Sequence, residues 1–139
     1  MAKTFTAPFT QRKILAQAVA TTANTNFSST SIGNANLALL YTTAADGALV
    51  KRLSAIALGS NGGATQLQIF RQKVGGSLIL WRTKLMANYA FSASTENPVS
   101  EFSIEIDNPW GLEPGEKIYV GISVATTSGI GFSAEIEEF

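Results

Sequence analysis

The stretch VSEFSIEID at residues 99–107 decides the fold class, because apolar and polar side chains alternate along it. Phe102, Ile104 and Ile106 fall on one side of an extended chain, and the acidic residues fall on the other. This period of two is typical of a β-strand with one buried and one solvated face. Residues 117–125 (KIYVGISVA) and 130–136 (IGFSAEI) repeat the pattern. We therefore expect an all-β protein whose strand acids face water.

Strand-like runs continue through the rest of residues 37–139, separated by Gly, Asn, Asp and Pro. The runs comprise residues 37–43, 48–58, 65–73, 77–84, 86–91 (a weaker candidate), 99–107, 117–125 and 130–136. About eight strands at this spacing favour an antiparallel β-sandwich, either a jelly roll or a related Greek key. We expect residues 37–139 to form this domain.

Local signals predict how some strands connect. Asp46-Gly47 suits a tight turn and predicts a hairpin between residues 37–43 and 48–58, and residues 126–129 predict a second one before the last strand. Apolar side chains change faces around Lys51-Arg52, which predicts a β-bulge. The run at 78–81 is apolar on both faces, so we expect burial on both sides, with an intermolecular contact as the alternative.

Residues 1–36 differ from the rest and are expected to form an N-terminal arm or extended segment. Residues 21–36 are almost all Thr, Ser, Asn and Ala, which indicates an extended or poorly ordered chain. Residues 11–20 fit a strand better than a short helix. Four side chains near the start are our interface candidates: Phe5, Phe9, Arg12 and Lys13. The alternative is a frayed tail, or an arm folded on its own sandwich.

The composition bounds the function. The 139 residues suit one domain, and the chain contains neither His nor Cys. Catalysis by a Ser-His-Asp triad or a Cys nucleophile is therefore excluded, together with His or thiolate metal sites. The carboxylates alternate as solvated strand residues rather than pairing as in glycosidases. We expect no enzymatic activity, no cofactor and no metal.

Charge is divided along the chain although the net charge is zero. Residues 1–89 carry nine Lys and Arg against Asp46 alone, and residues 90–139 carry nine Asp and Glu against Lys117 alone. Cross-strand pairing within one molecule is the simpler interpretation. Head-to-tail association into a ring such as a trimer is the alternative. The zero net charge argues against nucleic-acid binding, and no apolar run is long enough for a membrane span.

Several features resemble the small jelly-roll structural proteins of tailed-phage virions. They are the Thr/Ala/Asn-rich start, LVKRL at 49–53, the Gly75-Gly76 turn, and LEPGEKI at 112–118 before a late Val/Ile strand. The resemblance implies a capsid decoration (cement) protein, a spike base or a fibre-attachment protein. Decoration is the function we expect first. The resemblance also implies a homo-oligomer, with a trimer favoured, that binds the major capsid protein or another virion protein and is made in the host cytoplasm.

A different class of function is open as the alternative. A carbohydrate-binding sandwich module would use an aromatic side chain as a stacking platform. Trp110 is the best candidate, because the turn-forming context of residues 107–116 places it outside the alternating core pattern. The competing interpretation is that Trp110 closes one end of the sandwich.

Overall fold

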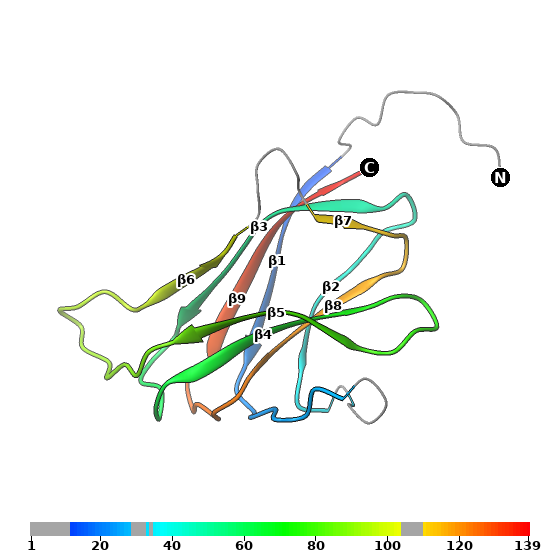
Figure 1. The fold of residues 1–139 in the computed structure, drawn as a ribbon. Helices are drawn as coiled ribbons and strands as arrows, with labels where there is room; N and C mark the ends of the chain where they lie inside the picture. The colour runs from blue at the N-terminus through cyan, green and yellow to red at the C-terminus, as the bar shows by residue number, and fades with distance from the viewer. Residues whose placement is uncertain (1–11, 29–32, 34, 104–109) are drawn as a thin grey trace, which may run out of the picture.

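In a computed structural model, the described part of the chain is a β-sandwich of nine strands in two antiparallel sheets (Figure 1). The structure describes residues 12–28, 33, 35–103 and 110–139. Within these residues there is no helix, and hence none that could cross a membrane. The predicted all-β sandwich is confirmed.

The larger sheet has the order β1-β9-β3-β6, with β7 pairing beside β3 as a fifth strand. Its strands are β1 (Arg12–Ala20), β9 (Ile130–Glu138), β3 (Ala48–Ala57), β6 (Val99–Phe102) and β7 (Trp110–Leu112). Figure 1 shows β1, β9 and β3 running side by side. The strand preferred for residues 11–20 is therefore found as β1. It lies within the predicted N-terminal segment and pairs along its whole length with β9.

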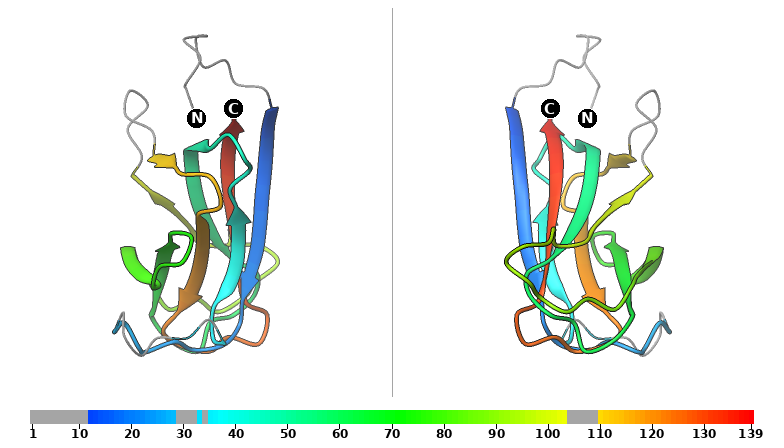
Figure 2. Two further views of the ribbon diagram at one scale, coloured as in Figure 1. Left: turned by 90° about the vertical axis from the view of Figure 1, so that its right-hand side faces the viewer. Right: turned by 90° about the vertical axis from the view of Figure 1, so that its left-hand side faces the viewer.

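The smaller sheet has the order β2-β8-β4-β5. Its strands are β2 (Ala38–Thr42), β8 (Lys117–Ile122), β4 (Thr65–Gln72) and β5 (Ile79–Met86). In the side views, β1 (blue) and the β4–β5 hairpin (green) lie on opposite sides of the molecule (Figure 2). The sandwich therefore has two lateral edges at which strands of different sheets face each other, β1 with β2 and β5 with β6.

The pairing of the strands is nested. β4 pairs with β5, β3 pairs with β6 and β7, β2 pairs with β8, and β1 pairs with β9. The chain is thus arranged like one long hairpin that is folded over, with the β4–β5 turn at its tip. Both hairpins predicted at Asp46-Gly47 and at residues 126–129 are wrong, because each of these turns connects strands of different sheets. Turn chemistry specifies a reversal of the chain but not the sheet that the next strand joins.

The main core lies between the sheets and follows the alternation seen in the sequence. Along β9, Ile130, Phe132, Ala134 and Ile136 are buried. In β3 the buried positions change parity at a break in register between Val50 and Arg52, which confirms the bulge predicted there. The bulge keeps both halves of this long strand facing the core.

The outer surface of the smaller sheet is covered by the segment that follows β1. Asn24 Nδ2 donates to Gln68 Oε1 at 3.0 Å, and Gln68 Nε2 donates to the Asn24 carbonyl at 2.9 Å. Phe27 stacks on Phe70, which belongs to a small outer cluster with Leu78 and Tyr119. Residues 21–28 are therefore extended, as predicted, and their role is to bury this face of the sheet.

Two predictions about strands need correction. Residues 87–91 form no strand, because Met86 ends β5 and a loop follows. Leu78 is buried as expected, but Ile79 is 59% exposed, so the run at 78–81 is not buried on both faces. The second half of the strand expected over 99–107 lies outside the described residues, although Val99–Phe102 is found as β6.

Ion pairs account for much of the divided charge. Arg12 pairs with Glu138, Lys13 with Glu137, Arg52 with Glu101, Arg71 with Glu116 and Lys73 with Glu113. Each of these five pairs joins a basic residue from the first part of the chain to an acidic residue from the second. The nested pairing causes this, since it brings early strands beside late segments: β1 beside β9, β3 beside β6, and the end of β4 beside the turn that precedes β8. Cross-strand pairing within one molecule, the simpler interpretation, is confirmed.

Candidate functional site

The lateral edge beside β5 is the candidate functional site, and we call it the β5 seam. It is the boundary between β5, at the edge of the smaller sheet, and β6 and β7, at the edge of the larger one. Within the described ranges, no backbone pairing joins the two sheets here. Long side chains from β4 and β5 cross the boundary instead.

Two tryptophans meet across the seam. Trp81 comes from β5 and Trp110 from β7, and their ring centroids are 3.8 Å apart with the planes tilted by 51°. Trp81 is the extra residue of a bulge, since Arg82 pairs with Ile69 and Leu80 pairs with Phe70. A bulge re-aims the side chain that it contains. Both rings are half-buried and pack against the main core.

Three cations reach across the seam as well. The Arg71 guanidinium lies 4.1 Å from the Trp81 ring centroid, and its Nη2 donates to the Gly111 carbonyl at 3.0 Å. The Arg82 guanidinium lies 5.3 Å from the Trp110 ring centroid. Lys84 Nζ donates to the Glu101 carbonyl at 2.7 Å. Arginine over an indole face is favourable by about 0.5–2 kcal/mol, so the seam is held by aromatic and cationic contacts.

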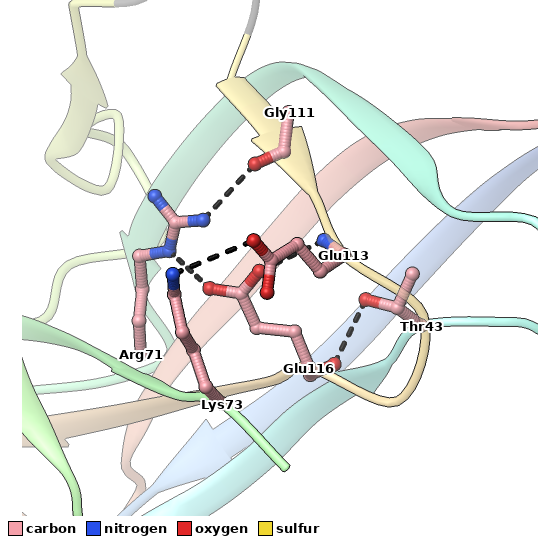
Figure 3. A network of polar contacts seen from close by, with 6 residues as sticks. All are labelled: Thr43, Arg71, Lys73, Gly111, Glu113 and Glu116. Atoms are coloured by element: carbon pink, nitrogen blue, oxygen red, sulfur yellow. Dashed lines mark hydrogen bonds and ion pairs between the residues drawn. The ribbon is translucent and has the colours of Figure 1, made fainter. Parts of the chain in front are cut away.

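A buried carboxylate anchors one end of the seam (Figure 3). Glu116 is 1% exposed, and its Oε1 lies 2.6 Å from Arg71 Nε. Its Oε2 accepts a hydrogen bond of 2.9 Å from the Glu113 N–H, and its carbonyl accepts bonds from the Thr43 hydroxyl and N–H. Burial alone would raise the pKa of Glu116, but Arg71, the Glu113 N–H and Lys73 stabilise the charged form and leave the pKa below its usual range.

The turn before Glu116 explains this geometry. Pro114 and Gly115 are its central residues, Gly115 has φ of +78°, and the Glu116 N–H donates to the Glu113 carbonyl at 3.0 Å. Proline followed by a glycine with positive φ is typical of a type II turn. The turn brings the Glu113 N–H back to the Glu116 carboxylate, and thus directs the carboxylate toward Arg71 on β4.

A pocket of about 340 Å³ opens at this end of the seam. Its walls combine apolar Ile79 and Trp81 with polar and charged groups; the remaining lining residues are Arg71, Lys73, Gly76, Ser77 and Glu116. Because Glu116 neutralises Arg71 and Glu113 pairs with Lys73, this pocket contains no carboxylate free to act as a base. Among the described residues, no group of His, Cys, Asp and Glu could hold a metal ion.

The interface candidates from the sequence lie away from the seam or cannot be placed. Phe5 and Phe9 lie outside the described residues. Arg12 and Lys13 are exposed on β1, where Arg12 Nε lies 3.1 Å from Glu138 and Lys13 Nζ lies 3.8 Å from Glu137. Their charges are thus directed at β9 of the same molecule.

Trp110 lies in the short strand β7 rather than in the turn that the sequence predicts. It packs on the main core with Trp81, and Arg82 lies over its ring. A sugar stacking on that ring would compete with both neighbours. From the sequence, Trp81, Tyr89, Trp110 and Tyr119 were all possible stacking platforms, with Trp110 the best of them, and Glu116 was not singled out. The convergence of Trp81, Trp110 and Glu116 depends on the bulge in β5 and on the nested pairing, neither of which leaves a local signal.

Comparison with known proteins does not assign a family. A scan against protein-family models finds no match, and a search of the curated proteins finds no relative. The resemblance to small virion proteins therefore remains an expectation from the sequence, and function has to be inferred from the surface of the molecule.

Proposed function

We propose that this chain is a non-enzymatic structural protein of a virus particle, acting as a capsid decoration protein through contacts with other protein surfaces. The supporting observation is an apolar row on the outer surface of the larger sheet. Val19, Ile56 and Val99 are exposed there and share one cross-strand row through Gly131. Leu58 is also exposed and lies over Gly131. We call these four side chains the apolar row.

The position of the apolar row favours an interface. The neighbouring row of the same surface is polar and contains Gln17, Ser133, Ser54 and Glu101. These four apolar side chains are thus contiguous at one end of the sheet, whereas Leu15, 58% exposed on the same surface, lies apart beyond the polar row. Contiguous apolar patches on a protein surface are typical of sites that bind another protein.

The strand order supports the resemblance to jelly-roll virion proteins on which the proposal draws. In a jelly roll, one long antiparallel hairpin is rolled into two four-stranded sheets. The nested pairs seen here, from β4–β5 at the tip to β1–β9 at the ends, follow that scheme. β6 and β7 both pair with β3, one after the other along the same side of that strand. The fold alone carries no function, since sandwiches serve many roles. It is consistent with the virion proteins that the sequence resembles.

Light scattering of the purified chain tests the assembly part of the proposal. We expect a trimer or another closed ring that persists at high salt, because the charges are largely paired inside each molecule and the apolar row makes the contact. Ile56→Glu should reduce the mass to that of a monomer, whereas Gln17→Glu, which adds the same charge to the same surface, should not. A monomer that also fails to sediment with empty capsid shells from the same source would refute the proposal.

A further inference from the structure

We infer that the free edge of β5 binds an acidic, extended polypeptide segment of a partner protein, which adds to the smaller sheet as a further strand. This inference deepens the proposed function, on which it rests, by assigning a second contact surface and the chemistry of its partner. Strand addition is a common mode of recognition, in which backbone hydrogen bonds supply affinity and side chains supply specificity.

The first support is the position of β5. It is the last strand in the order β2-β8-β4-β5, so within the described residues one side of its backbone has no strand partner. Its residues are unusually open for a strand: Ile79 is 59% and Leu85 68% exposed, and only Met86 is buried. An exposed edge presents unpaired N–H and C=O groups to an incoming chain.

The second support is charge. Arg82 and Lys84 project from β5, and among the described residues neither takes part in an ion pair. The Lys84 ammonium donates to the Glu101 carbonyl and the Arg82 guanidinium to the Trp81 carbonyl, so in the described part of the chain neither charge faces a carboxylate partner. An acidic segment would neutralise these charges on one face of the strand, and its apolar side chains would cover Leu85 on the other.

The third support is the composition of the surroundings. Tryptophan and arginine are the residues most enriched where binding energy concentrates in interfaces. The seam beside β5 contains Trp81, Trp110, Arg71 and Arg82 in mutual contact. A strand added at β5 would lie along this seam and would exclude water from the two indole rings.

The two tryptophans make the inference testable without a label, since the chain has no others. We would titrate the protein with a capped octapeptide of alternating glutamate and valine and follow the tryptophan emission. The same peptide with lysine in place of glutamate is the control. Amide hydrogen exchange over residues 79–86 would be measured with and without peptide. We expect an emission change with the acidic peptide alone, slower exchange in β5, and affinity that falls with added salt.

Lys84→Glu should weaken binding by about ten-fold or more, whereas Lys51→Glu, the same charge reversal on β3, should not. Equal binding of both peptides, or no emission change, would overturn the inference. An emission change without protection of the β5 amides would show contact by side chains only and would also overturn the inference. A response to maltohexaose but not to the peptide would assign the seam to carbohydrate, with the same consequence. Light scattering separates this outcome from the proposed function, because self-association is tested at Ile56 on β3 and peptide binding at Lys84 on β5.

Discussion

The Glu116 carboxylate lies 2.6 Å from the Arg71 guanidinium and is 1% exposed, whereas the Arg71 side chain is 25% exposed. One partner of the ion pair is therefore removed from water and the other is not. Through this pair, the turn after β7 is fastened to β4, and the Glu116 carbonyl binds Thr43 before β3. A single buried acid thus connects three parts of the chain.

Replacing Glu116 with Gln should lower the free energy of unfolding by about 1–3 kcal/mol. The amide keeps the shape but loses the charge that faces Arg71, and the partial exposure of Arg71 limits the cost. Urea denaturation measures this difference. Glu113→Gln is the matched control: its pair with Lys73 is 3.4 Å long, with both side chains about two-thirds exposed, and should change stability by less than about 1 kcal/mol. Equal effects of the two substitutions would contradict the role given to Glu116.

The lowered pKa of Glu116 predicts how stability depends on pH. A carboxyl group whose pKa is lower in the folded than in the unfolded protein stabilises the fold above its ordinary value of 4.5, and this contribution is lost as the pH falls through the folded pKa. The difference in unfolding free energy between the wild type and Glu116→Gln should therefore be constant near neutral pH and shrink below about pH 4.5. A difference that stays constant down to pH 2 would show that Glu116 acts through packing alone.

Tyr41 predicts a loss of stability at alkaline pH, because its pKa is raised rather than lowered in the folded protein. Its hydroxyl donates to Glu138 Oε1 at 2.7 Å, and burial, followed by this bond and the charge of Glu138, raises the pKa of Tyr41 well above its ordinary value. Stability from this group is present below about pH 10 and is lost as the pH rises. Ultraviolet difference spectroscopy should show a phenolate signal that appears only on unfolding and that is missing in Tyr41→Phe. Ionisation of Tyr41 in the folded protein near pH 10 would contradict this prediction.

Gly121 should not tolerate a side chain. A Cβ at this position would lie 2.6 Å from Leu37 Cδ2 and 2.9 Å from Gln68 Oε1, beneath the segment that covers the smaller sheet. Gly121→Ala should thus destabilise the protein by about 1–3 kcal/mol in thermal denaturation. At Gly62 a Cβ would meet nothing within 4 Å, so Gly62→Ala should be close to neutral. A neutral Gly121→Ala would indicate that the Leu37 and Gln68 side chains can move away from this position at little cost.

Local periodicity predicted most strands, because alternation along β3, β8 and β9 is a property of each strand alone. Even the bulge in β3 was visible, since it changes the parity of the apolar residues. The partners of the strands were not visible: Asp46-Gly47 specifies a turn, but whether β3 then joins the same sheet depends on β9, far along the chain.

The candidate site was less predictable for the same reason. Trp110 stood out because it lies among turn residues, whereas Trp81, Arg71 and Glu116 each resemble ordinary members of a strand or turn. Their meeting at the β5 seam requires the bulge at Trp81 and the antiparallel neighbours β4 and β8. Likewise, the cross-strand ion pairs could be expected from charge division, but their members could not be chosen until the register of β1 against β9 was known.

The nested pairing has a consequence for biosynthesis. β9 lies between β1 and β3 in the larger sheet, so neither of these strands can pair with β9 until it has left the ribosome. Pairs that are distant in sequence also form slowly, because a large loop must close first. The β4–β5 hairpin can form early, whereas β1, made before it, is among the last strands to pair. Until then the growing chain exposes unpaired edges, and folding competes with misassembly between neighbouring chains on the same messenger.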